Sequence, residues 1–331
     1  MVVSFFRKSR SAAILAIPVL ALGLSLFHSF FSPEPSPSLY MPLYEPVADL
    51  LLGFRLVSIL VNAGLITAGA FLLNRICTKM EILNTTSYMP GLVYVLFMGS
   101  SVRISGTHPL LFTNVFILLV LMKMFQTHRK ETAFGELFDS GTLLGISVLF
   151  FFPSFVFIPL VWICLTIIRP FICRGWIIGF LGFLIPFIFV AAYFFLRDGL
   201  ESVFRDKIIS PFSEITVSFD IQGPSWLLAG LVLFIVLVSL PGAFRGKAII
   251  TLRAKNHFLI LLWFLILGLV GTTISPYSSE IIYLFCGIPL SVFIANFFLS
   301  VKRIFLAEFL AFSWMVFILL NQFLWENFQG F

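Results

Sequence analysis

The strongest constraint on this chain is a series of apolar segments that follow one another from residue 11 to residue 325. A helix needs about 20 apolar residues to cross the hydrocarbon core of a bilayer, and a helix buried inside a bundle needs fewer. Charged residues make up only 11% of the chain, against about 25% in a soluble domain, and the mean hydropathy is +1.08. Because a soluble core cannot hide this much apolar surface, we expect the chain to be surrounded by lipid.

Inside lipid the backbone has to satisfy its own hydrogen bonds, which favours helices. We therefore predict an all-α fold, a single transmembrane domain over residues 1–331 with about eleven spans. The predicted spans are Ser11–Phe31, Val47–Leu73, Tyr88–Val102, Leu110–Gln126, Ser140–Phe152, Ser154–Ile168, Gly175–Phe195, Ser225–Leu240, His257–Ile274, Ile281–Leu299 and Phe305–Trp325. The fifth and sixth are short and are broken at Pro153, so a re-entrant hairpin that does not cross is an alternative.

The distribution of charge predicts the orientation of the bundle. Most of the 21 lysines and arginines, from Arg7 and Lys8 to Lys302 and Arg303, fall in alternate connections between the spans. Positive residues favour the cytoplasmic side, so we expect the N-terminus inside and the C-terminus outside a bacterial inner membrane. The first span begins like a signal peptide, but many spans follow it, and we interpret it as an uncleaved anchor.

Two predicted outer loops are long enough to carry a function. Residues 32–46 are rich in proline and end in aromatic and acidic residues. Residues 197–224 begin with a helical apolar stripe that contains charges, which is typical of a helix lying in the membrane interface, and then alternate like a short strand at 215–219.

The candidate functional residues lie near these outer loops. Charges inside a span are costly and mark functional sites by default. Arg55 lies inside the second predicted span, below Glu45 and Asp49. An arginine below a carboxylate could hold an anionic headgroup or phosphate, although Arg55 could also simply extend to the interface and pair with an acidic neighbour. Arg103 and His108, in the next outer loop, could bind phosphate or form a solvated turn.

Several other patterns suggest packing or terminal contacts rather than chemistry. Glu308 is expected to extend toward Lys302 and Arg303, and Asp139 to complement the dipole at the start of the fifth span. Two pairs with GxxxG spacing, Gly141/Gly145 and Gly175/Gly179, predict close helix contacts. The four cysteines form no disulfide framework, the four histidines have no metal-site spacing, and no nucleotide-binding motif occurs. No basic stripe accompanies the aromatic residues, which argues against nucleic acid.

Two resemblances add to these expectations. The segments Met41–Glu45, Ala70–Arg75, Thr86–Leu96, Phe138–Gly141 and Phe150–Pro153 resemble an uncharacterised family of polytopic inner-membrane proteins from Bacteroidota. More loosely, the order of features is similar to the C-fold integral-membrane glycosyltransferases. That likeness implies an acidic catalytic residue on the first outer loop and basic residues that hold a polyprenyl-phosphate-linked sugar.

Three functions follow as hypotheses. The first is a glycosyltransferase-like protein in which Glu45, or else Asp49, is the general base, while Arg55, Arg103 and His108 bind the substrate phosphate. Its donor would be a lipid-linked sugar, with no other cofactor evident, and its partners membrane lipids and polyprenyl phosphate. The second is a subunit or scaffold of an envelope assembly or export complex. The third is a transporter, which predicts paired charges near the middle of the bilayer.

Overall fold

The computed structural model describes residues 2–7, 11–31, 41–83, 85–100, 108–129, 133–168, 173–197, 225–245, 252–274, 281–301 and 304–329. In this part of the chain the regular structure is entirely helical. The helices are α1 (Val2–Arg7), α2 (Ser11–Phe31), α3 (Glu45–Leu52), α4 (Arg55–Lys79), α5 (Met89–Gly99), α6 (Pro109–Gln126), η1 (Thr127–Arg129), α7 (Phe134–Phe150), η2 (Phe152–Phe157), α8 (Ile158–Ile168), α9 (Cys173–Phe195), α12 (Ser225–Arg245), α13 (Leu252–Ile274), α14 (Ile281–Ser300) and α15 (Ile304–Gln329).

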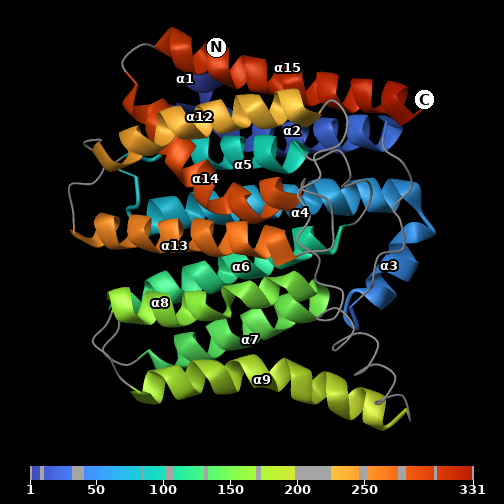
Figure 1. Ribbon diagram of the computed structural model, residues 1–331, viewed down its shortest axis with the longest axis vertical. Helices are drawn as coiled ribbons and strands as arrows, with labels where there is room; N and C mark the ends of the chain where they lie inside the picture. Colours follow the sequence, from blue (N-terminus) through green and yellow to red (C-terminus); the bar gives the residue numbers. More distant parts are fainter. Residues whose placement is uncertain are drawn as a thin grey trace.

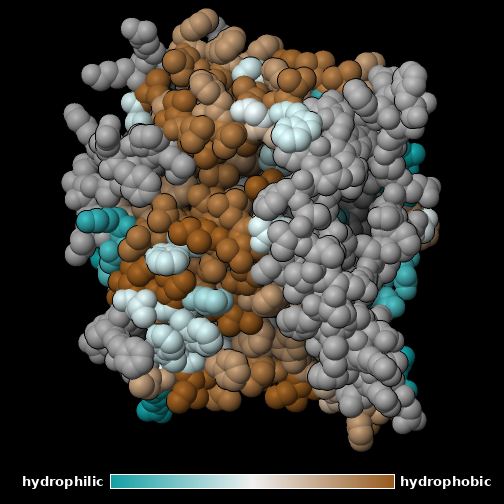
Figure 2. All heavy atoms as spheres, in the orientation of Figure 1, coloured by the Kyte–Doolittle hydropathy of each residue, from teal (hydrophilic) through white to brown (hydrophobic). Residues whose placement is uncertain are grey.

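The long helices lie roughly side by side, and α3 lies across their ends (Figure 1). Apolar side chains cover most of the visible described surface between those ends, and hydrophilic side chains gather near the two margins where the helices end (Figure 2). This is the pattern expected of a bundle whose middle faces hydrocarbon and whose ends face headgroups and water.

The predicted helices and the observed ones correspond in order. Seven helices in the described residues are long and apolar enough to cross a membrane, namely α2, α4, α6, α9, α13, α14 and α15. Shorter apolar helical segments lie at Met89–Gly99, Phe152–Ile168 and Trp226–Ser239. The protein is therefore a helical, apolar, membrane-type bundle. The break predicted at Pro153 is present, because the chain is extended at Phe151 between α7 and η2.

The second predicted span, Val47–Leu73, is not one helix. The chain leaves the helix at Gly53 and Phe54, and Phe54 is extended, so α3 ends at Leu52 and α4 begins at Arg55. Arg55 is therefore the first residue of α4 and does not lie two turns inside a span. The apolar run continues across the break, so hydropathy alone does not reveal it.

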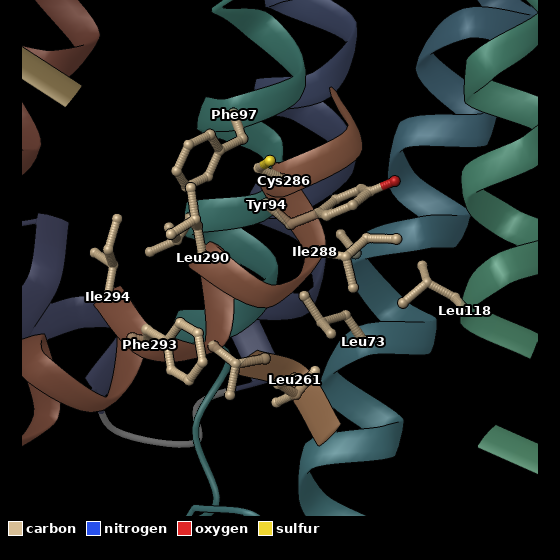
Figure 3. Close-up of a cluster of buried hydrophobic side chains, with 14 of the residues drawn as sticks. Leu73, Tyr94, Phe97, Leu118, Leu261, Cys286, Ile288, Leu290, Phe293 and Ile294 are labelled. Carbon is tan, nitrogen blue, oxygen red and sulfur yellow. The ribbon is translucent and has the colours of Figure 1, made fainter. Parts of the chain in front are cut away.

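The short helix α5 lies at the centre of the bundle, and all of its residues are buried. It packs against α14, α4 and α2. Figure 3 shows the centre of this core, where Tyr94 and Phe97 of α5 lie beside Ile288 and Leu290 of α14. An 11-residue helix is only about 16 Å long, shorter than the hydrocarbon core, so α5 needs the surrounding helices to satisfy its ends.

Glycines allow α7 and α9 to approach one another closely, as their spacing predicts. A Cβ added at Gly141 would lie 2.1 Å from the Gly179 carbonyl oxygen, and one at Gly182 would lie 2.3 Å from the Phe138 oxygen. Thr142 of α7 also donates a hydrogen bond to the Gly182 carbonyl, at 3.2 Å. Small residues at such contacts are the usual way in which membrane helices gain packing energy.

The N-terminal helix α1 is fixed by two long-range contacts. The Glu308 carboxylate of α15 accepts hydrogen bonds from the backbone amides of Val3 and Ser4, at 3.1 and 2.8 Å. The Arg7 guanidinium donates to the Leu299 carbonyl near the end of α14, at 2.9 Å. Glu308 thus stabilises the start of α1, a contact that was not expected. Lys302 and Arg303, its predicted neighbours, lie outside the described residues.

Candidate functional site at one end of the bundle

Helix α3 carries both predicted catalytic carboxylates. It is amphipathic, because Tyr44, Ala48 and Leu51 form a buried stripe at helical spacing. Glu45 and Asp49 are four residues apart and therefore share a different face of the same helix. Asp49 is exposed and Glu45 is half-buried. The structure thus brings the two predicted acids together on one side of α3.

The turn before α3 is anchored to the bundle. The Leu43 amide donates to the Leu149 carbonyl at the end of α7, at 3.4 Å, and the ring of Tyr44 packs edge-on against Phe112 of α6, with centroids 6.2 Å apart. Pro46 occupies the first turn of α3, where its fixed φ favours helix initiation and its missing amide costs nothing. The carboxylate pair therefore stands on a fixed element.

An apolar groove of about 360 Å³ lies beside this turn, between the start of α3 and the last turns of α9. Pro42, Leu43 and Pro46 line one side of it. The α9 side is formed by Phe189, Val190, Tyr193 and Phe194. The volume falls within the range of ligand pockets, and the lining suits a hydrocarbon chain rather than a polar molecule. Glu45 is adjacent in sequence to the lining residue Pro46.

Beside the groove, an arginine that the sequence analysis did not single out contacts the lining residue Tyr193. The Arg197 guanidinium lies 4.8 Å from the centroid of the Tyr193 ring, and both side chains are exposed. Arginine over an aromatic face gains about 0.5–1 kcal/mol at an exposed site. The signal was present in the sequence as an aromatic residue four positions before an arginine at the end of an apolar helix.

The structure places two of the three predicted phosphate-binding residues, Arg55 and His108, at the starts of different helices. Arg55 is exposed at the start of α4, and its guanidinium donates to the Ser29 carbonyl near the end of α2. It therefore links α2 to α4 next to the α3–α4 break. Arg103 lies outside the described residues, as do most of the predicted outer loops 32–46 and 197–224 and the alternating segment 215–219.

His108 acts as the N-cap of α6. Its Nδ1 accepts a hydrogen bond from the Leu110 amide at 3.2 Å, and its ring lies 5.6 Å from that of Phe151, centroid to centroid. Burial lowers the pKa of His108 to about 4, because the charged imidazolium is poorly solvated there. At neutral pH His108 is therefore uncharged, and its contribution to binding a phosphate would be a hydrogen bond without a net charge. That role stays a prediction.

Asp139 lies in the second turn of α7 rather than before the helix. Its carboxylate pairs with Lys123 of α6, with Nζ and Oδ2 2.7 Å apart. The two side chains are 32% and 48% exposed, so such a pair contributes little to stability. Among the described residues no group of three or more histidine, cysteine and acidic side chains could hold a metal ion.

A family model described as "Family of unknown function (DUF6427)" matches residues 52–328. The chain belongs to this family. The match covers most of the bundle, from the end of α3 to the end of α15, and so includes Arg55, His108 and the α9 side of the groove, while Glu45 and Asp49 precede it. Among curated proteins and among solved structures nothing matches the chain. The family carries no assigned activity, so the site itself has to support any function.

Proposed function

We propose that this protein acts on a polyprenyl-phosphate-linked sugar at the outer face of the membrane, as a glycosyltransferase-like enzyme. The observation that carries the proposal is the apolar groove between α3 and α9, which lies beside a carboxylate-bearing helix and has an arginine against its lining residue Tyr193. A polyprenyl phosphate combines a long hydrocarbon chain with an anionic group. The groove offers an aromatic wall for the former, and Arg197 and Arg55 offer cations for the latter.

The chemistry assigned to these residues is a group transfer. Glu45, with Asp49 as the second choice, takes the proton of an acceptor hydroxyl. The acceptor oxygen forms a bond to the anomeric carbon, and the bond from that carbon to the phosphate oxygen breaks. The electron pair leaves with the polyprenyl phosphate, whose negative charge the nearby arginines, with Arg103 as a further candidate, stabilise.

Replacing Glu45 with glutamine tests this assignment, because the amide keeps the shape but cannot accept the proton. We expect the Glu45→Gln variant to fold normally and to lose transfer by a factor of about 100 or more. The measurement is release of polyprenyl phosphate from a purified polyprenyl-phosphate-sugar in nanodiscs. Glu136→Gln, a half-buried acid in α7, is the matched control.

Full transfer by Glu45→Gln would exclude Glu45 as the base, and transfer lost in Glu45→Gln and Asp49→Asn together would then point to Asp49. Lipid extraction from the purified protein separates the alternatives. A bound polyprenyl lipid supports the transferase, whereas a stoichiometric protein partner without such a lipid supports the subunit of an envelope or export complex.

We also propose that the bundle crosses a bacterial inner membrane eleven times, with the N-terminus in the cytoplasm and the C-terminus outside. The charge distribution supports this orientation. It places the α3–α4 break outside and the start of α9 inside.

Labelling of cysteines from outside tests the orientation. Cys173, at the start of α9, is exposed, whereas Cys77, Cys164 and Cys286 are buried. In spheroplasts we expect a membrane-impermeant maleimide to leave the wild-type protein unlabelled and to label Phe54→Cys in a Cys173→Ser background. Phe54 is 64% exposed, so the new thiol is accessible. Labelling of Cys173 in sealed spheroplasts, with none at position 54, would reverse the proposed topology.

A further inference from the structure

A second, smaller cavity lies between helices of the bundle, away from the groove, and Leu24, Ile66 and Met98 form the apolar part of its lining. It has a volume of about 10 Å³, room for one water molecule, and is lined by residues of α2, α4, α5 and α15. Its polar lining comes from helices far apart in the sequence: Ser25, His28, Asn62, Gly99 and Gln322. The side chains of Ser25, His28, Asn62 and Gln322 are each at least nine-tenths buried.

Three of the lining residues carry a buried side-chain oxygen without a hydrogen-bond partner in the part of the chain that the structure describes. Ser25 Oγ, Asn62 Oδ1 and Gln322 Oε1 are all buried and have no partner among the described residues. Ser25 is unlike buried helical serines such as Ser140 and Ser147, whose hydroxyls donate to the carbonyl three residues earlier. Buried polar atoms in proteins nearly always have a partner, so three orphan oxygens around one cavity indicate an occupant.

The orientation of the Gln322 amide follows from its neighbours. Its Nε2 lies 3.3 Å from the Gly99 carbonyl oxygen, which can only accept, and 3.4 Å from His28 Nδ1. Turning the amide over would put two acceptors against each other at Gly99. Gln322 therefore presents its own oxygen as an acceptor, as the Asn62 oxygen does, while the Ser25 hydroxyl can both accept and donate.

The local backbone adds negative potential to the cavity. Helix α5 ends at Gly99, beside the cavity, and its last carbonyls carry the negative end of the helix dipole. Ser25 and His28 lie in the last two turns of α2, whose C-terminal end also points to this region. In membrane proteins the carbonyl ends of helices that stop inside a bundle bind sodium or protons.

The positions of the lining residues along three helices give the same depth for the cavity. Ser25 lies six residues before the end of α2, Asn62 lies seven residues after the start of α4, and Gln322 lies seven residues before the end of α15. At 1.5 Å per residue each count gives about 10 Å from the helix ends. The cavity therefore lies about 10 Å inside the end of the bundle that carries the α3–α4 break and the proposed outer site.

We propose that this cavity binds one monovalent alkali cation, with Ser25 Oγ, Asn62 Oδ1 and Gln322 Oε1 as ligands. The C-terminal end of α5 points toward this cation. One water molecule would donate to the two amide oxygens and accept from the Ser25 hydroxyl, whereas the carbonyl ends of α5 and α2 that point to this region favour a cation, which all three oxygens bind through their lone pairs. An anion is disfavoured by the oxygen lining. Among the described residues no carboxylate lines the cavity, which favours a monovalent ion over a divalent one. The site does not depend on the proposed transferase activity.

The experiment measures the thermal unfolding of the purified full-length protein in nanodiscs at constant ionic strength, with sodium, potassium or lithium chloride replacing N-methylglucamine chloride. A ligand that binds only the folded state raises Tm with its concentration. We expect a saturable rise of at least about 3 °C for one of the three alkali ions. The same Tm in all four salts would show that the cavity holds water only and would overturn the proposal.

Variants then place the effect at this cavity. Ser25→Ala removes one ligand and should lower the apparent cation affinity about tenfold or more, whereas Ser147→Ala, which removes a buried hydroxyl used by its own helix, should leave the affinity unchanged. Asn62→Asp adds a negative charge and should raise the affinity at least about tenfold. Because Asn62→Asp is expected to gain binding, a general loss of folding cannot imitate the result. If Tm depended on the cation concentration equally in all the variants, the cation would bind elsewhere and the proposal would be wrong.

Discussion

Replacing Gly141 with alanine is expected to separate α7 from α9 and to destabilise the protein by about 3 kcal/mol or more. The new Cβ would lie 2.1 Å from the Gly179 oxygen and 2.9 Å from the Phe183 amide nitrogen, and both are backbone atoms. Backbone of a packed helix cannot move aside as a flexible side chain can, so the helices would have to part. Because α9 packs chiefly on α7, this loss would release α9 from the bundle.

Gly135 provides the matched control, since it lies in the same helix and an added Cβ there meets nothing within 4 Å. Alanine favours a helix over glycine by roughly 0.5–1 kcal/mol, so Gly135→Ala should be neutral or slightly stabilising. Tm of the purified variants in one detergent gives the comparison. Equal Tm values for Gly141→Ala and the wild type would show that the two helices are not in this close contact.

Replacing Trp314 with alanine has the second large expected effect, a loss of about 3–5 kcal/mol. Trp314 is fully buried on α15 and packs edge-on against Phe97 of α5, with ring centroids 4.7 Å apart. Its Nε1 donates to Ser100 Oγ at 3.1 Å, next to the end of α5. Inside a bilayer, helix association depends on such packing rather than on removal of apolar surface from water. The space that the missing indole ring leaves behind therefore accounts for most of the lost stability.

Two further variants separate the packing from the hydrogen bond. Trp314→Phe keeps a ring but loses the donor, and should cost about 1 kcal/mol. Phe312→Ala removes an aromatic ring that is 61% exposed on the same helix, and should change stability by less than about 0.5 kcal/mol. Denaturation in mixed micelles measures the free energy of unfolding of Trp314→Ala, Trp314→Phe and Phe312→Ala. A loss in Phe312→Ala as large as in Trp314→Ala would contradict the assignment of Trp314 to the core.

The sequence predicted apolar helices of membrane type in the observed order, because insertion into lipid is a local property, although several bounds differ, as for Ser140–Phe152 against α7 (Phe134–Phe150). The first predicted span, Ser11–Phe31, matches α2 in both bounds, and the glycine spacing predicted close helix packing, while the structure shows that α7 and α9 are the helices that meet. The α3–α4 break was missed because no proline or polar run interrupts Val47–Leu73 at Gly53. That break moved Arg55 from inside a span to the start of α4.

The roles of the candidate site residues stay a prediction, and only their local arrangement can be compared with the sequence. Glu45 and Asp49 do share one face of a helix, because four-residue spacing fixes that relation without any tertiary information. The groove was not foreseen, since Pro42 and Phe189 come together only when α9 packs beside the start of α3. The contact between Glu308 and α1 joins residues about 300 positions apart and has no local signal either.

What the sequence by itself determined is that the chain forms apolar helices of membrane length and where their charged ends lie. Only the tertiary structure decided which faces meet, and so brought Ser25, Asn62, Gly99 and Gln322 around one cavity. The physical reason is that lipid and a packed neighbour are both apolar. A helix such as α4 is therefore apolar on nearly all sides, and its sequence lacks the alternation of polar and apolar faces that shows, in a soluble protein, which side is buried.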